Sequence, residues 1–514
     1  MECIGIDFIK IGEVCYRMKK RNSVYICSII IAALIAFFAI CFKNVFQSFS
    51  NTLFDFMTTR FGWLYLIAML FFVGFSVYVA VSKYGKIRLG NDDSEPEYSN
   101  ISWFAMLFCA GMGVGLVFWG ISEPLSHYIS PIAVVEPFSN NAIDFAFKSV
   151  FMHWGIHPWA AYAVIGLPLA YFQFRKNKPG LISSSMESLV GERRTRGYVG
   201  KIVDILAAFA TIAGIVTSLG LGVLQINSGL EMVFGFPNNN MSQILIIVVI
   251  TAVFILSAVS GVDKGVKKLS NITLVLMVIF MVICFVIGPK QEIVNNLTNG
   301  LGLYLNDFFK DSLMFSTYGD TSWTTEWRVF YWAWWIAWAP FVGMFIARIS
   351  KGRTIREFIF GVVLVPSIAS FIWFSIFGSL GIHLGVNGTL DAETLAQVAG
   401  NPEIGLFVVL AKYPIAIGTS IIVLVLLLSF FITSADSGTY VLAMICSDGN
   451  ITPPNYKKVV WGTVLALIAI GLLLAGGLKP LQTISIAAAF PFILIMLAAC
   501  AALLKELQNE FKRE

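Results

Sequence analysis

The chain carries four tryptophans within seven residues of one apolar segment, in the run FYWAWWIAWAPF. They are Trp332, Trp334, Trp335 and Trp338. The face of an indole ring is negative, so tryptophan suits a cation that has no hydrogen to donate. Tryptophan also collects at membrane interfaces, but so dense a cluster, followed by Pro340, favours a buried site. The run therefore predicts a binding site for a quaternary ammonium compound.

A second aromatic group lies in the run HWGIHPWAAYAV and comprises Trp154, Trp159 and Tyr162. Pro158 cannot donate a hydrogen bond to the carbonyl of Trp154, which predicts a kink at this place. A kink would turn all three rings toward one side. Ordinary packing of large aromatic side chains between helices explains the same residues equally well.

Two histidines of this run, His153 and His157, have the i, i+4 spacing of a zinc-binding pair. No glutamate lies between them and the sequence offers no third ligand nearby. A structural role is therefore favoured over a metal site.

The run FFITSADSG places two hydroxyl residues, Thr433 and Ser434, close to Asp436. Sodium is a hard cation and prefers oxygen ligands, as calcium and magnesium do. In a helix, such hydroxyls often bond back to the carbonyl of the preceding turn instead. The carboxylate favours a functional interpretation, because ionisable residues within membranes are expensive, although it also suits a helix cap.

Three glycines in the run GMGVG, Gly111, Gly113 and Gly115, predict an interruption of the helix that contains them, because glycine is costly in a helix interior. Backbone amides freed by such a break can bind a carboxylate. The spacing of Gly111 and Gly115 also fits close packing of two helices.

The elements that must position these residues are membrane-spanning helices. The chain is 57% hydrophobic and 13% charged, whereas soluble proteins carry about 25% charged residues. A span needs about 20 apolar residues. This predicts an all-α polytopic membrane protein with twelve transmembrane helices. They are expected at 24–42, 61–82, 101–122, 141–174, 201–232, 241–261, 269–289, 326–350, 358–384, 414–446, 458–476 and 480–504.

The third and eighth spans are both expected to be interrupted, by the glycine run and by Pro340. These two helices begin two sets of five that start on opposite sides of the membrane, which predicts a 5+5 inverted repeat preceded by two extra helices. The expected segments are a cytoplasmic N-terminal segment (1–23), a transmembrane domain (24–504) and a short cytoplasmic tail (505–514). The domain divides into two leading helices (24–99), a first repeat (100–290), an external amphipathic segment (291–325) and a second repeat (326–504).

Most of the 35 lysines and arginines fall in loops assigned to one side. By the positive-inside rule, both termini lie in the cytoplasm of a multi-pass protein of the cell membrane. The net charge of +5 is thus a topology signal, and no nucleic-acid partner is expected. The eight cysteines lie singly and show no disulfide or metal spacing. The sequence shows neither three metal ligands nor a nucleophile–base pair, so an enzyme is not expected.

The chain resembles the betaine/choline/carnitine transporter family in four runs, at 109–124, 153–162, 330–358 and 430–440. The likeness covers roughly 24–504 and is closest to the sodium-coupled glycine betaine transporters. It implies a ten-helix inverted-repeat core of the amino-acid/sodium symporter type, usually in a homotrimer. The expected function is import of glycine betaine, or a close trimethylammonium zwitterion, by sodium symport for osmoprotection. A choline or carnitine transporter or exchanger of the same family is the alternative.

The resemblance also implies the roles of individual residues. The substrate cage falls on Trp154, Trp159, Tyr162, Trp334, Trp335 and Trp338, with Gly111, Gly113 and Gly115 near the carboxylate. A sodium site falls on the backbone of Cys109 and Met112 and on Phe430, Thr433 and Ser434.

A second sodium site in the family uses two threonines and a phenylalanine. Thr211 and Phe341 match it, but the other threonine is Ile215 here, which argues against two sodium ions. Choline-type members tend to carry aspartate where this chain has Gly115, so a zwitterion is favoured. Carnitine exchangers place an arginine in the sodium site, whereas the segment 202–232 has no lysine or arginine. Sodium is expected as the coupling ion, with no other cofactor.

Overall fold

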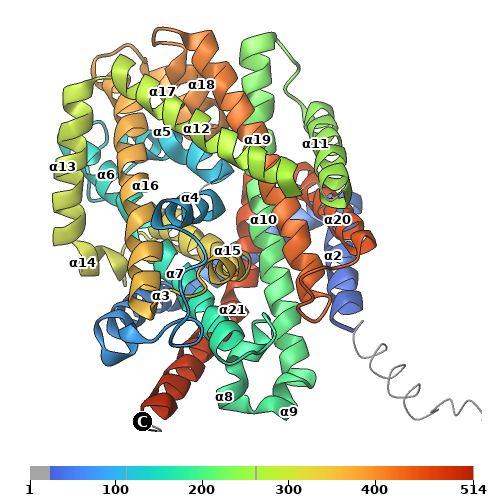
Figure 1. Ribbon diagram of the computed structural model, residues 1–514. Coiled ribbons are helices and arrows are strands. Elements are labelled where there is room, and N and C mark those ends of the chain that lie inside the picture. The colour runs from blue at the N-terminus through green and yellow to red at the C-terminus, as the bar shows by residue number, and fades with distance from the viewer. Residues whose placement is uncertain (1–22, 112, 261–262, 513–514) are drawn as a thin grey trace, which may run out of the picture.

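The computed structural model describes residues 23–111, 113–260 and 263–512, and the side chains of these except 108–111, 260 and 263–268. The described chain is helical (Figure 1), with one isolated β-bridge between Arg88 and Thr354. This confirms the all-α prediction.

Ten described helices are long and apolar enough to cross a membrane. They match ten of the twelve expected spans and support a polytopic membrane protein. They are α2 (Ser23–Cys41), α3 (Lys43–Val81), α10 (Tyr198–Phe234), α11 (Asn240–Ser260), α12 (Asp263–Ile287), α15 (Phe330–Ile349), α16 (Ile355–Val386), α19 (Ala416–Ile445), α20 (Asn455–Leu474) and α21 (Leu478–Phe511).

The third expected span is divided at the glycine run. It consists of α4 (Asn100–Gly111) and α5 (Val114–Ile129). Gly113 precedes α5 with φ −142° and ψ −139°, far from helical values. The predicted interruption is therefore confirmed. Trp373 of α16 donates to the carbonyl of Leu116 over 3.1 Å and so ties the first turn of α5 to its neighbour.

The fourth expected span is also divided, into α6 (Asn140–Trp154) and α7 (Ile156–Ala170). The break lies at Gly155, next to the carbonyl of Trp154 that Pro158 cannot bond to, so the predicted kink of this span is confirmed. Pro158 lies in the first turn of α7, where a missing N–H removes no helical hydrogen bond. At Gly155 an added Cβ would lie 2.7 Å from the ring of Phe371, so the chain turns where only glycine fits.

Helix α15 runs unbroken through Pro340, so the predicted interruption of the eighth span is wrong. Nearly every residue of this helix is buried, and it packs against α7, α10 and α21. Packing from several sides can hold a helix together at a proline inside a membrane protein. The only irregularity described at this span is a π-helix, η4 (Thr324–Val329), which leads into α15. The two broken spans are therefore the third and the fourth, and not a corresponding pair.

Helix α15 lies in the middle of the molecule, with α4, α7 and α10 around it (Figure 1). Helices α7 and α15 approach each other closely at Gly166, where an added Cβ would lie 3.2 Å from the carbonyl oxygen of Gly343. Helices α2, α11 and α20 lie together toward one side. This arrangement places the tryptophan-rich segment in the core.

The first part of the expected amphipathic segment at 291–325 is helical. It forms α13 (Lys290–Asn306) and α14 (Phe308–Ser312), and α13 packs on α6 and α16. The remaining short elements are η1 (Lys83–Lys86), η2 (Tyr171–Arg175), η3 (Ser183–Met186), α8 (Glu187–Val190), α9 (Glu192–Thr195), α17 (Ala392–Gly400), η5 (Pro402–Ile404) and α18 (Gly405–Leu410).

The expected tail at 505–514 continues helix α21 as far as Phe511. Lys505 donates to the carbonyl of Ser188 over 2.6 Å, and Glu510 accepts from Arg175 and from Tyr171. The tail is therefore docked on α8 and on η2. Figure 1 shows the C-terminal end beside α8 and α9, at the opposite end of the molecule from α17 and α18.

Candidate functional site

A small cavity lies where the glycine break of the third span meets α6, α10 and α15. Its volume is about 10 Å³, which is about the space that one water molecule needs. It is lined by Gly113, Val114, Gly115, Leu116, Trp154, Ser218, Trp334, Trp335 and Trp338. Four of the six predicted cage aromatics and two of the predicted glycines are therefore brought together.

We call this space the tryptophan cavity. The rings around it form two walls. Trp334 and Trp335 of α15 stack with centroids 4.8 Å apart and planes 15° apart. Trp154, the last residue of α6, meets Trp335 edge to face, with centroids 4.9 Å apart and planes 73° apart. The break at Gly155 is what ends α6 at this ring.

Hydrogen bonds fix three of the four indole rings. The Nε1 atom of Trp335 donates to the carbonyl of His153 over 2.9 Å, and that of Trp338 to the carbonyl of Gly214 over 2.6 Å. The Nε1 atom of Trp154 donates to the carboxylate of Glu123 over 2.7 Å. The buried Nε1 of Trp334 has no partner among the described residues, so it is available to an acceptor on a ligand.

Glycine is required at two points of the tryptophan cavity. A Cβ on Gly115 would lie 2.7 Å from Trp334 and 3.2 Å from Trp154. A Cβ on Gly214 would lie 2.5 Å from Trp338. Side chains at either point would displace the rings, so these glycines set how closely α5 and α10 approach α15.

The other two predicted cage residues, Trp159 and Tyr162, do not line the tryptophan cavity. Tyr162 lies edge to face with Trp335 at 6.3 Å, and Trp159 with Tyr162 at 5.5 Å. Both are buried in α7. They extend the row of rings from the cavity along α7, and their predicted contact with substrate stays a prediction.

Of the predicted sodium residues of α19, Ser434 lies beside the glycine break. The hydroxyl of Ser434 would lie 3.6 Å from a Cβ on Gly113. Thr433 donates to the carbonyls of Ser429 and Phe430, over 2.9 and 3.2 Å, which is the local bonding expected for threonine in a helix. Their predicted role in holding sodium stays a prediction.

Three predicted site residues at or just before the glycine run are described in part or not at all. Met112 lies outside the described residues, and so does the side chain of Cys109. Gly111 ends α4. Their predicted contacts with sodium and substrate therefore stay predictions.

The position of the missing second threonine is filled by packing. A Cβ on Gly438 of α19 would lie 2.3 Å from Cδ1 of Ile215, so the two helices interlock there. The neighbouring Thr211 donates to the carbonyl of Ala207 in its own helix over 2.8 Å. Phe341 packs edge to face against Trp338, with centroids 5.4 Å apart.

Sequence reasoning missed three residues of this region, Glu123, Tyr331 and Ser218. Glu123 directly follows the last residue of the expected third span, at 101–122, so it falls outside the apolar run. Its burial is complete, and a carboxylate inside a membrane span is a signal for a site. Tyr331 precedes Trp334 and Trp335 by one helical turn, so the i, i+3 and i, i+4 spacing marks the shared face. Ser218 follows Gly214 by one turn and lines the cavity.

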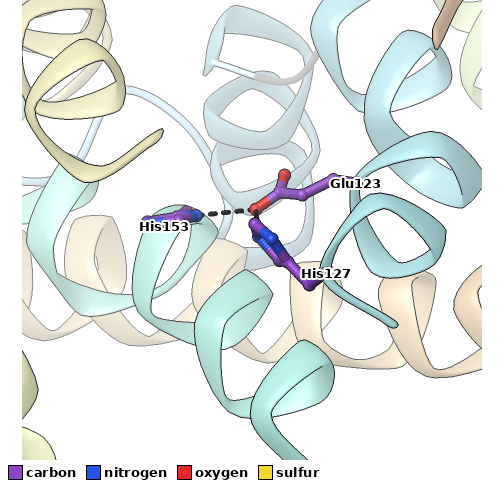
Figure 2. A group of neighbouring side chains, drawn as sticks. All are labelled: Glu123, His127 and His153. Carbon is purple, nitrogen blue, oxygen red and sulfur yellow. Dashed lines mark hydrogen bonds and ion pairs between the residues drawn. The ribbon is translucent and has the colours of Figure 1, made fainter. Parts of the chain in front are cut away.

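The two histidines of the zinc-like spacing have different partners. His153 bonds to Glu123 through Nδ1 over 2.6 Å, and His157 bonds to the hydroxyl of Ser312 through Nε2 over 2.9 Å. Within the described residues, the group with the composition of a metal site is instead Glu123, His127 and His153, whose ligand-type atoms lie within 4.8 Å of one another. Figure 2 shows the rings of His127 and His153 turned toward the carboxylate of Glu123.

Comparison with known proteins gives matches along nearly the whole chain. The family model described as BCCT, betaine/carnitine/choline family transporter, matches residues 23–512. A glycine betaine transporter, OpuD, of Bacillus subtilis is 43% identical over 495 residues, which cover 96% of each chain. A probable glycine betaine transporter of Desulfitobacterium hafniense is 45% identical over 96% of this chain and 98% of its own. An ectoine/hydroxyectoine transporter of Virgibacillus pantothenticus is 41% identical over the same shares.

Proposed function

The chain belongs to the betaine/carnitine/choline transporter family, and from this premise we propose that it imports glycine betaine, or a close trimethylammonium zwitterion, by sodium symport. The family and the relatives are transporters, so the protein is a multi-pass membrane transporter and not an enzyme. The finer proposal rests on the residues of the tryptophan cavity.

One observation carries the proposal: four indole rings surround a cavity at a helix break. A quaternary ammonium group has no N–H to donate, so it is recognised by ring faces, each contact contributing about 0.5–2 kcal/mol. Trp334, Trp335 and Trp154 offer faces and edges at angles that can enclose such a group.

The other end of the substrate would meet hydrogen-bond donors. The first amides of α5 follow Gly113, and the N-terminus of a helix attracts negative charge. The unpaired Nε1 of Trp334 is a further donor. Rings for a cation and donors for a carboxylate together favour a zwitterion over choline, which has no carboxylate. An aspartate in place of Gly115 would collide with Trp334.

In the proposed cycle, substrate enters only when the rings separate, because the described cavity has room for about one water molecule. The structure then corresponds to a closed form. Separation of Trp154 on α6 from the stacked pair on α15 would open the site.

Sodium would bind between the glycine break and α19, at Phe430, Thr433 and Ser434 and at the backbone of Cys109 and Met112. Support comes from the position of Ser434 beside Gly113. An ion there would stabilise the break whose amides receive the carboxylate, which couples the two ligands. Because Ile215 fills the place of the second site, we propose one sodium ion per substrate.

The remaining parts of the proposal follow from the family resemblance. We include twelve spans, counting the two broken ones, an inverted-repeat core, a homotrimer in the cell membrane, both termini in the cytoplasm, and a role in osmoprotection. The resemblance and the lysine and arginine distribution support these parts.

The test is uptake by the purified protein in proteoliposomes. Radiolabelled glycine betaine, carnitine, choline and ectoine are each supplied with an inward sodium gradient, with equal sodium on both sides, or with potassium only. We expect accumulation of glycine betaine that requires the sodium gradient. Faster uptake of choline or ectoine would overturn the substrate, and sodium-independent exchange would overturn the coupling.

A further inference from the structure

A buried carboxylate lies directly behind the tryptophan cavity, on the same helix as its glycine wall. Glu123 of α5 is fully buried. Its Oε2 atom accepts from Nε1 of Trp154 over 2.7 Å and from the hydroxyl of Tyr331 over 2.6 Å. Its Oε1 atom lies 2.6 Å from Nδ1 of His153 and 3.4 Å from Nε2 of His127. Four side chains from α5, α6 and α15 thus meet at one carboxylate.

The hydrogen bonds indicate that this carboxylate is ionised and the histidines are neutral. Trp154 can only donate. His127 accepts from Nε1 of Trp323 at its Nδ1 atom over 3.3 Å, so its proton lies on Nε2, the atom that faces Glu123. Nδ1 of His153 lies within hydrogen-bond distance of Oε1, and a neutral imidazole protonated there donates to it. An ionised Glu123 is then satisfied by three donors, Trp154, Tyr331 and His153, while Nε2 of His127 makes a longer contact of 3.4 Å.

The negative charge is not cancelled by a direct cationic partner. Among the described residues, Glu123 forms no ion pair with lysine or arginine. The nearby Arg328 lies over the ring of Trp323 at 5.1 Å and donates to the carbonyl of Asp311, whose carboxylate pairs with Lys148 over 3.0 Å. Water is excluded here, so the charge of Glu123 is weakly screened.

The same carboxylate is connected to the rings of both walls. It holds Trp154 directly. It also holds His153, whose carbonyl fixes the indole of Trp335, and Tyr331, whose ring lies 5.7 Å from that of Trp154. An anion that accepts from an indole N–H also increases the negative charge of that ring face, which is the property that attracts a cation.

We propose that Glu123 is the specificity-determining residue that makes the tryptophan cavity prefer a positively charged head group over a neutral one of the same shape. It acts through the rings as a positioning residue and supplies the negative charge behind them. This inference rests on the proposed function, because it takes a quaternary ammonium group as the occupant.

The experiment compares two ligands of nearly equal shape by calorimetric titration of the purified protein. One ligand is glycine betaine and the other is 3,3-dimethylbutanoate, in which carbon replaces the charged nitrogen. Glu123→Gln keeps the shape and one acceptor oxygen but removes the charge. We expect it to weaken the binding of glycine betaine about tenfold and to change the binding of 3,3-dimethylbutanoate, whose head group is neutral, less than twofold, so the preference between the two ligands falls. Asp144→Asn, which removes a half-exposed carboxylate on α6, is the matched control and should leave the preference unchanged.

The outcomes separate the inference from the proposed function. Equal weakening of both ligands in Glu123→Gln would show a structural role only and overturn the inference. Failure of the unaltered protein to bind glycine betaine would instead overturn the proposed function. Glu123→Asp withdraws the charge by one methylene and should lower the preference about threefold. An unchanged preference in this variant would overturn the inference even where Glu123→Gln does not fold.

Discussion

Adding a single methyl group at Gly115 tests how closely the tryptophan cavity is fitted to its ligand. In Gly115→Ala the new carbon would lie 2.7 Å from Trp334 and 3.2 Å from Trp154. Non-bonded carbons are most stable about 3.5–4.0 Å apart, so the ring of Trp334 must retreat by roughly 1 Å. Because Trp334 stacks on Trp335 at 4.8 Å, the displacement passes to the second ring. Overpacking of this kind costs about 1–3 kcal/mol.

That cost corresponds to a change of about 5- to 150-fold in an equilibrium constant. The methyl group projects into the space that the ligand must share, so we assign most of the cost to the bound form. We expect the KM for glycine betaine uptake to rise at least fivefold, with the protein still folded. Uptake against substrate concentration in proteoliposomes measures this.

The matched control is Gly74→Ala on α3, where an added Cβ meets nothing within 4 Å. It should leave KM unchanged and should not destabilise the helix, since alanine is the better helix former. A normal KM in folded Gly115→Ala would refute the reasoning. So would an equal rise of KM in both glycine variants.

Three further variants address the other parts of the site. Trp335→Leu removes a ring face and a stack, so glycine betaine binding measured by calorimetry should weaken at least tenfold. Thr433→Ala with Ser434→Ala should raise the sodium concentration for half-maximal uptake about tenfold, since two oxygen ligands are lost. Trp338→Phe removes the indole donor to the carbonyl of Gly214, which also accepts from Ser218 over 3.3 Å, so it should destabilise the protein by about 0.5–1.5 kcal/mol and lower the temperature of thermal unfolding in detergent.

Exposed residues of the same types provide the controls. Thr463→Ala on α20 removes an exposed threonine that bonds back within its own helix in the same way as Thr433. It should not change the sodium dependence. Trp63 on α3 is about half exposed, and its replacement by leucine or phenylalanine should affect neither binding nor thermal unfolding appreciably. Effects of equal size in a control and its test variant would contradict the assigned roles.

The positions of the long helices could be predicted because the bilayer dictates apolar stretches of a fixed length. Helix α16 is a case, since its bounds lie within three residues of the expected 358–384. Helix α3 shows the limit. It begins at Lys43, far before the expected start at 61, because the mixed composition of 43–60 hides a helix from a search for apolar runs.

The helix breaks were harder to predict. The effect expected of a proline is read from its own segment, whereas packing depends on helices far away in the sequence. The span with Pro158 does break, at Gly155, whereas the span with Pro340 does not, since neighbouring helices enclose α15. The actual break at Gly155 depends on the ring of Phe371, which comes from α16. No pattern within the fourth span contains that contact.

The cage was predicted better than the charge behind it. Four tryptophans of the predicted set meet at one cavity. They could be predicted because tryptophan is rare, so a cluster of it in the sequence marks a site. The role of Glu123 could not be predicted without the fold, because its donors Trp154 and Tyr331 lie 31 and 208 residues away along the chain. A single carboxylate at the edge of an apolar run looks the same in the sequence whether it faces solvent or a buried set of donors.

The stacked pair Trp334 and Trp335 also has an optical consequence. Two indoles with centroids 4.8 Å apart and planes 15° apart are close enough for their electronic transitions to couple, which produces a characteristic near-ultraviolet circular dichroism signal. Trp154 lies 4.9 Å from Trp335, so its withdrawal from the pair in the proposed opening would change the coupling among the three indoles. The protein would therefore carry its own chromophore for that opening, which could be followed in membranes without an attached label.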